Sequence, residues 1–207
     1  MESGGNTAGK AEDRFERLVL PVIFDHEGRK YSNHPHDAGG PTKYGVSLKF
    51  AQQYGDRDGD GKADLDLDGD GDVDADDIKL MTPEVAAVVY RSEWWGRYGY
   101  DRILDVGIAT KVMSLAINLY SAKLAHRLLQ RALRACGHPV QEDGVLGDIS
   151  IKAINSQPGW LLLAAFRSEA AGHYRMIYER RKAAISLGSK NPPFDAFIEG
   201  WLNRAYS

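Results

Sequence analysis

The chain has 207 residues, of which 43% are hydrophobic, and this is enough apolar material for a folded core. That composition excludes an intrinsically disordered chain. No run approaches the ~18 apolar residues needed to span a membrane, and the single cysteine, Cys136, excludes an internal disulfide. The length suits one domain of two lobes or two small domains.

The charge is unevenly distributed along the chain. Residues 56–77 hold eleven of the 29 acidic residues but only two of the 26 basic ones, a local net charge of −9. The remaining residues are mildly basic, which suits an anionic polymer such as a cell wall. A solvated basic face without a partner would give the same balance.

The N-terminal part predicts a leader and an amphipathic helix. Residues 1–12 lack the apolar core of a secretory signal and are expected to be a flexible leader. Over residues 12–26, apolar side chains recur with the i, i+3, i+4, i+7 spacing of a helix. Pro21 predicts a kink, and Gly28 ends the helix. Glu27 therefore falls at a helix C-terminus, where the helix dipole disfavours a negative charge.

The middle of the chain alternates turns and short helices. Residues 31–46 are dense in Gly, Pro, Asn and Asp, which predicts turns or a short irregular hairpin. A short helix is expected over 47–54, before the aspartate-rich segment. Another helix is expected to begin with Thr82 as its N-cap and Pro83 in its first turn.

The C-terminal half is predicted to be helical. A long helical region covers 105–136, with a break near Tyr120 and Ser121, and a loop follows at 141–147. Further helices are expected over 147–156, 158–186 and 194–206. The prediction is a mainly α protein with one small irregular or β element.

The aspartate-rich segment has the ligand spacing of a calcium loop. From Asp66 to Asp77, carboxylates fall at positions 1, 3, 5, 9 and 12 of a twelve-residue loop, and Gly71 stands at position 6, where the chain must turn sharply. Position 12 is Asp in place of the usual Glu, as in dockerin-like loops. The alternative interpretation is a solvated acidic linker.

A second, overlapping copy of the loop begins at Asp56. Its position 12 is Leu67, so the copy is incomplete, and Asp66 is the candidate substitute. One or two calcium ions are therefore expected, as a structural clip or a switch that the chemistry does not require. The candidate ligands are Asp56, Asp58, Asp60, Asp64, Asp66, Asp68, Asp70, Asp72, Asp74 and Asp77.

Two carboxylates and a hydroxyl lie in the order that a glycoside hydrolase could use. Such an enzyme needs a carboxylic acid to protonate the leaving oxygen and usually a second carboxylate. Glu27 supplies the first, Asp37 is a candidate for the second, and Thr42 offers a hydroxyl to hold a water. Spacing alone does not distinguish Glu27 from an ordinary surface carboxylate.

Several ordered motifs carry a family resemblance. The run DHEGRKYSNHPHDAGGPTKYGVS resembles the N-terminal signature of the glycoside hydrolase family 108 muramidases, roughly E-G-G-Y, a polar turn, then D-P-G-G-x-T-x-x-G-I. The run MTPEVAAVVYRSEWW is similar to the family's T-P-E-x-A-x-x-I-Y-x-x-x-Y-W. From about residue 105, VMSLAINLY, LLQRAL, EDGVLGDIS and FIEGWLNRA match the predicted peptidoglycan-binding domain that follows in this family.

The resemblance covers about residues 13–55 and 82–206, and the calcium segment lies outside the common pattern. There are departures within it. Arg29 stands where the family has a second Gly, Ala38 replaces a frequent Pro, and one extra residue lies between Glu27 and Asp37. The family's Asn-Ser-Gly is Asn-Leu-Tyr here, at 118–120.

The resemblance implies a lysozyme-like, two-lobed, mainly α fold with a small irregular or β hairpin near the active site, into which an EF-hand-like calcium loop is inserted. It also implies hydrolysis of the bond between N-acetylmuramic acid and N-acetylglucosamine, with Glu27 as general acid, and lysis of bacterial cell walls. The implied substrate contacts are Tyr44, Trp94, Trp95, Asn118 and Tyr120, although core packing is the alternative for both tryptophans.

We expect a catalytic lobe over 13–104, with the calcium insert at 55–80, and a peptidoglycan-binding lobe over 105–207. The expected partner is peptidoglycan, for a monomer that binds no nucleic acid and does not insert into membranes. It would be made in the cytoplasm and reach the periplasm or wall by holin-type release or dedicated secretion. Two other functions stay open: a lytic transglycosylase on the same bond, and a non-catalytic calcium-dependent wall-binding module.

Overall fold

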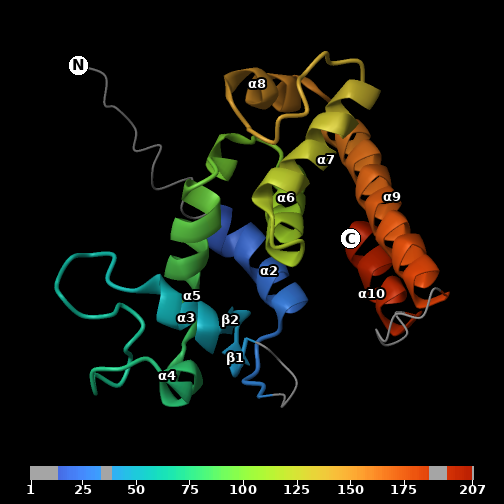
Figure 1. The fold of residues 1–207 in the computed structure, drawn as a ribbon. Coiled ribbons are helices and arrows are strands. Elements are labelled where there is room, and N and C mark those ends of the chain that lie inside the picture. Colours follow the sequence, from blue (N-terminus) through green and yellow to red (C-terminus); the bar gives the residue numbers. More distant parts are fainter. Residues whose placement is uncertain (1–13, 34–38, 187–194, 207) are drawn as a thin grey trace, which may run out of the picture. The chain divides into compact units, whose positions relative to one another are not determined.

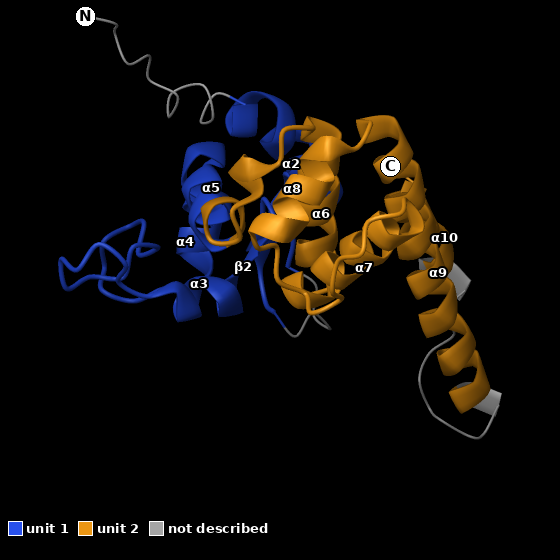
Figure 2. Cartoon of the chain, turned by 90° about the horizontal axis from the view of Figure 1, so that it is seen from above, with its two compact units in different colours: residues 1–93 blue, residues 94–207 orange. Residues whose placement is uncertain are grey.

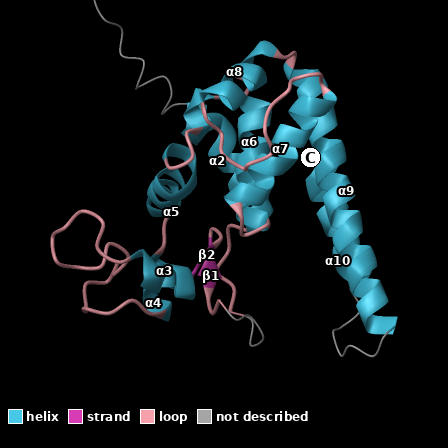
Figure 3. Ribbon diagram, turned by 45° about the horizontal axis from the view of Figure 1, so that its top comes forward, coloured by secondary structure: helices cyan, strands magenta, loops and turns pink. Residues whose placement is uncertain are grey.

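The computed structural model describes residues 14–33, 39–186 and 195–206 (Figure 1). Two compact units divide the chain, residues 1–93 and 94–207 (Figure 2). Within the described residues, helices dominate and the only sheet is a two-stranded antiparallel hairpin (Figure 3). The predicted fold class, mainly α with a small β element, is confirmed. The expected boundary after residue 104, between a catalytic and a peptidoglycan-binding lobe, stays a prediction.

The first helix of unit 1 contains a wider turn just before its proline. A π-helical turn, η1 (Phe15–Val19), continues into α2 (Leu20–Glu27). The N–H of Leu20 bonds to the carbonyl of Phe15, five residues back. A regular α-helix would bring the ring of Pro21 against the carbonyl four residues earlier, and the wider turn makes room for it. The predicted helix is therefore present, and the response to Pro21 is a π turn.

The small sheet of unit 1 follows after residue 39. Strands β1 (Thr42–Lys43) and β2 (Val46–Ser47) pair in antiparallel register, Thr42 opposite Ser47. Helix α3 (Leu48–Tyr54) begins directly afterwards, because the side chain of Ser47 accepts a hydrogen bond from the N–H of Phe50 and so caps the helix. The predicted hairpin and short helix are both present.

Two capped helices complete unit 1. Helix α4 (Ala75–Leu80) starts with a capping box between Asp74 and Asp77. Helix α5 (Pro83–Tyr90) starts with the predicted Thr82 cap, which accepts from the N–H of Val85, and runs into a second π turn, η2 (Arg91–Gly96). The core holds fully buried side chains from the first helix, α4 and α5: Phe15, Val19, Ile23, Ile78, Ala86 and Val89.

All the regular secondary structure in the described part of unit 2 is helical. Its elements are η3 (Tyr100–Arg102), α6 (Val106–Asn118), α7 (Ala122–Ala135), α8 (Asp148–Ser156), α9 (Gly159–Ser186) and α10 (Asp195–Tyr206). Helix α9 packs on α6, α7 and α10, and α6 packs on α7. The predicted break between the first two helices is present, since Ser121 caps α7. No helix within the described ranges is both long and apolar enough to cross a membrane.

A buried polar network in unit 2 fixes the loop that the sequence places at 141–147. The imidazole of His126 lies 2.8 Å from the Tyr100 hydroxyl and 2.9 Å from the carbonyl oxygen of Gly144. Gln130 accepts from the N–H of Gly144 and donates to the carbonyl of Val145. His126 is 3% exposed, and desolvation by burial lowers its pKa below the ordinary value of 6.5.

We expect this histidine to make unit 2 less stable in acid. Because its pKa is lower in the folded state, the unfolded chain takes up a proton first as the pH falls below about 6.5. The stabilising effect of the neutral ring is complete above that pH and is lost progressively below it. Urea unfolding of wild type and His126→Gln between pH 5 and 8 tests this expectation. As the pH is lowered from 8 to 5, the unfolding free energy should fall less steeply in the variant than in wild type. The same dependence on pH in both proteins would contradict the expectation.

Candidate active site

Glu27 is the last residue of α2, as the sequence predicts. Gly28 follows with a φ of 88°, and its N–H bonds to the carbonyl of Phe24 at 2.9 Å, which ends the helix. Glu27 itself is half-buried. The residue is thus partly buried at a helix C-terminus, where the helix dipole disfavours a negative charge. A group that keeps its proton near neutral pH can act as a general acid.

The hairpin turn lies directly against the side chain of Glu27. A Cβ atom on Gly45 would stand 2.6 Å from Glu27 Cβ and 2.2 Å from the hydroxyl oxygen of Tyr90. Both distances are too short for real atoms, so the turn can pack this closely against α2 and α5 only because residue 45 has no side chain. The φ of Gly45 is 76°, which also favours glycine. Sequence analysis did not single out Gly45 or Tyr90.

Aromatic rings surround the same turn. Tyr44 has a φ of 51°, so both turn residues have positive φ, as a type I′ hairpin turn requires. The ring of Phe24 lies 5.0 Å from that of Tyr44 and 6.0 Å from that of Tyr90. The hydroxyl of Tyr90 donates to the carbonyl of Tyr44 at 3.0 Å. The half-buried Tyr44 thus packs the hairpin as well as being a candidate substrate contact.

Thr42 belongs to the same hairpin. Its backbone exchanges two hydrogen bonds of 2.8 Å with Ser32, which adds a bridge outside β1. The hydroxyl donates to the carbonyl of Gly40 at 3.3 Å, and the side chain is half-buried. The hairpin therefore carries both Thr42 and the turn that touches Glu27. Asp37 lies outside the described residues, so its role stays a prediction.

A groove of about 460 Å³ runs between the first helix and α5 of unit 1. Its apolar lining residues are Leu20, Pro21, Phe24, Pro83, Ala87 and Val88, and its charged lining residues are Glu16, Arg29, Glu84 and Arg91. Glu27 and Thr42 do not line it. Phe24 belongs both to this groove and to the aromatic cluster at the hairpin turn.

The predicted contacts in unit 2 differ in exposure. Trp95 is 2% exposed and packs edge-on against Tyr100, with ring centres 6.5 Å apart. Its ring belongs to the core, which favours the packing alternative for this tryptophan. Trp94 is half-buried, and Asn118 accepts a hydrogen bond of 2.5 Å from the hydroxyl of Tyr174. Tyr120 is 97% exposed.

The aspartate-rich segment contains two loops with the same backbone design. In the first, Asp56 accepts from the N–H groups of Gly59 and Gly61. In the second, Asp66 accepts in the same way from Gly69 and Gly71. All four glycines have positive φ. The structure therefore repeats at an interval of ten residues, as the overlapping sequence patterns predict.

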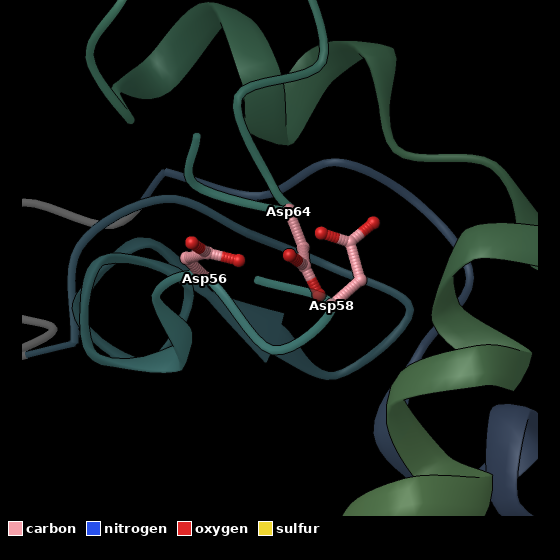
Figure 4. A group of neighbouring side chains, drawn as sticks. All are labelled: Asp56, Asp58 and Asp64. Carbon is pink, nitrogen blue, oxygen red and sulfur yellow. The ribbon is translucent and has the colours of Figure 1, made fainter. Parts of the chain in front are cut away.

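Carboxylates gather in three groups along these loops. In each group, one carboxylate oxygen from each residue lies within 4.8 Å of the others. Figure 4 shows the side chains of the first group, Asp56, Asp58 and Asp64. The other groups are Asp66, Asp68 and Asp70, and Asp72, Asp74 and Asp77. Asp60, the remaining candidate ligand, accepts from the N–H of Lys62.

The two loops are closed by different aspartates. Asp77 is 1% exposed and accepts from the N–H groups of Leu67 and Asp74. In the first loop, the equivalent N–H, that of Arg57, bonds to Asp64. Asp64 therefore takes the closing position in the first loop, whereas Asp66, which the sequence offered as the substitute for Leu67, groups with its own loop.

The negatively charged carboxylates in the second loop repel one another. The pKa of Asp72 is raised, chiefly by the negative charge of Asp70, with desolvation and Asp74 adding to it. A hard divalent cation would relieve this repulsion, and carboxylate oxygens are the ligands that Ca²⁺ prefers. The donor set thus fits calcium.

Comparison with known proteins assigns both halves of the chain. The family model described as glycosyl hydrolase 108 matches residues 20–119, and that described as a predicted peptidoglycan domain matches residues 124–206. The chain therefore contains a glycosyl hydrolase 108 domain. That domain belongs to a family of glycoside hydrolases, and a predicted peptidoglycan domain follows it in the chain.

Several solved structures are similar to the chain, and the match to one of them covers nearly the whole chain. The structure of SagA from Brucella abortus matches with a TM-score of 0.59 and 22% identity, and the match covers 96% of this chain and 91% of that one. At this identity the likeness shows the fold alone. No curated protein sequence matches the chain.

The geometry explains two positions of the glycosyl hydrolase 108 pattern. Gly45 is the last glycine of the D-P-G-G-x-T-x-x-G signature, and it touches Glu27 and Tyr90, so a side chain there has no space. Tyr120 stands where the family has the glycine of Asn-Ser-Gly, and its φ of 50° is one that glycine adopts without strain. The departure at Tyr120 therefore keeps the turn and adds an exposed ring.

Proposed function

We propose that this glycosyl hydrolase 108 protein is an N-acetylmuramidase, which cleaves the bond between N-acetylmuramic acid and N-acetylglucosamine and so lyses bacterial cell walls. The observation that carries the proposal is the position of Glu27, half-buried at the end of α2 and directly against the hairpin turn. The peptidoglycan domain over residues 124–206 supports murein as the substrate.

In the proposed mechanism, Glu27 protonates the oxygen that leaves the broken glycosidic bond. Positive charge then develops on the sugar ring, and Asp37 is proposed to stabilise it. The hydroxyl of Thr42 would hold the attacking water by accepting a hydrogen bond from it. The proton that the water loses would pass to a carboxylate, that of Asp37 in inversion or that of Glu27 in retention. The separation of the two carboxyl groups decides between inversion and retention of the anomeric centre.

Mass spectrometry of the products tests the reaction type. Purified murein should be digested to muropeptides with reducing ends, because a water molecule adds across the cleaved bond. A lytic transglycosylase would give anhydro ends, lighter by one water. Products of the anhydro type would replace the proposal with that activity. A protein that binds murein but releases no muropeptides would be a wall-binding module.

We also propose that exposed aromatic rings, within the peptidoglycan domain and just before its first residue, contact the wall. Tyr120 is 97% exposed and Trp160 is 74% exposed, and such rings can stack on sugars. Trp94 and Asn118 remain candidate contacts.

Reaching murein requires that the protein leave the cytoplasm, so holin-type release or dedicated secretion is part of the proposal.

Calcium is proposed as a structural ligand of the aspartate-rich segment. The closing carboxylates would be Asp64 in the first loop and Asp77 in the second, so the loops would hold one ion each. The segment is joined to the hairpin, because Lys43 of β1 donates to the backbone carbonyl of Lys79 in α4. It is also joined to α3, since Gln52 donates to the carbonyl of Val73 at 3.0 Å. A bound ion would therefore steady the hairpin without taking part in the chemistry.

A further inference from the structure

We infer that Tyr90 is a positioning residue for the proposed acid, because its hydroxyl holds the turn at Tyr44 and Gly45 against the side chain of Glu27. The inference rests on the proposed function, since it assigns a task to a residue that supports Glu27. Tyr90 itself donates to the backbone and is not placed in contact with a sugar.

The first support is the anchoring of Tyr90. It is the last residue of α5 and is 1% exposed, so its ring is fixed in the core of unit 1. The ring meets Phe24 of α2 edge-on, with centres 6.0 Å apart. From that position its hydroxyl donates to the carbonyl of Tyr44 at 3.0 Å. Tyr90 therefore joins the turn to a rigid helix.

The second support is the close fit around Gly45. A methyl group there would lie 2.2 Å from the hydroxyl oxygen of Tyr90 and 2.6 Å from Glu27 Cβ. Groups from α2, the turn and α5 thus meet with no space between them. The turn covers the aliphatic part of Glu27 on one side and Tyr90 supports the turn from another. Moving the turn would change how much water reaches the Glu27 side chain.

The third support is the backbone strain at Tyr44, together with the position of Thr42 on the same hairpin. Tyr44 is one of only two non-glycine residues with positive φ in the described part of the chain, and such a conformation persists only when its surroundings hold it. The hydrogen bond from Tyr90 is one such restraint. The same hairpin carries Thr42, the proposed water ligand. Loss of the restraint should therefore disturb the acid and the water site together.

The test compares Tyr90→Phe with Tyr54→Phe in the full chain. Tyr54 is a matched control, because it is 6% exposed in the same unit and its hydroxyl lies 3.0 Å from the hydroxyl of Ser92, which does not belong to the hairpin. Each variant loses one hydroxyl and keeps its ring, so the two should melt at similar temperatures. We expect kcat on murein to fall at least about tenfold for Tyr90→Phe, since a misplacement of about 1 Å can lower a rate on the order of 100-fold.

The expected KM of Tyr90→Phe stays within about twofold of the wild-type value, because the hydroxyl does not touch substrate. Tyr54→Phe should keep the wild-type kcat. An equal kcat in the two variants, or a loss in Tyr90→Phe that follows its melting temperature, would overturn the inference. Wild type that releases no muropeptides would instead reject the proposed function.

A second measurement uses Gly45→Ala in both backgrounds. In wild type, the new methyl group meets the hydroxyl oxygen of Tyr90, and activity should fall. In Tyr90→Phe that oxygen is gone, so the same substitution should cost less, and the double variant should retain more activity than the product of the single losses. Losses that multiply without coupling would show that the hydroxyl and the turn act independently, against the inference.

Discussion

Glu27→Gln is expected to abolish clearing of purified murein. Glutamine has almost the same size but carries no proton for the leaving oxygen, and loss of a general acid lowers a rate about 10²–10⁴-fold. The fold should persist, because Glu27 is half-buried at a helix end and not in the core. Turbidity of a murein suspension and the yield of muropeptides by mass spectrometry measure the effect.

The matched control is Asp25→Asn. Asp25 lies two residues earlier on α2, its side chain is 67% exposed, and it pairs with Arg29 at 2.9 Å. Removing a surface carboxylate of this kind changes stability little, and the variant should clear murein at the wild-type rate. If Glu27→Gln cleared murein as fast as this control, another group would have to be the acid.

Helix positions and ends follow from the sequence because their causes are local. Thr82 caps the helix that the sequence predicts to begin there, and Ser121 caps the helix that follows the predicted break. Gly28 ends α2 directly after Glu27. Each of these residues acts on backbone groups within four residues of itself. The hairpin at 42–47 also follows from local turn chemistry. Glu27 could be placed at a helix end for this reason.

Contacts between distant segments do not follow in the same way. Tyr90 reaches a carbonyl 46 positions earlier in the chain, and no spacing rule predicts that pair. The π turn before Pro21 was expected only as a kink, since the sequence does not say how the helix absorbs the ring. Trp95 shows the same limit, because the sequence does not distinguish a tryptophan that stacks on a sugar from one that packs against a core ring such as that of Tyr100.

Removing calcium is expected to lower the melting temperature. A ligand present at about 100 times its Kd stabilises the folded state by about 2.7 kcal/mol. For a chain of this size about 1 kcal/mol corresponds to about 2–4 °C, so chelation should lower the melting temperature on the order of 5–10 °C. Calorimetric scans with calcium and with excess chelator measure the shift. An unchanged melt after complete calcium removal would reject the structural ion.

Asp77→Asn and Asp76→Asn separate an ion site from general acidity. The two residues are neighbours, but Asp77 is 1% exposed and closes the second loop, whereas the side chain of Asp76 is 63% exposed and pairs with Lys79. Both variants remove one negative charge from the segment. If a calcium ion is bound in the second loop, only Asp77→Asn should weaken the response to chelator, because only that carboxylate can reach the ion. Equal responses from the two variants would mean that calcium acts on the segment's overall charge and not at a defined site.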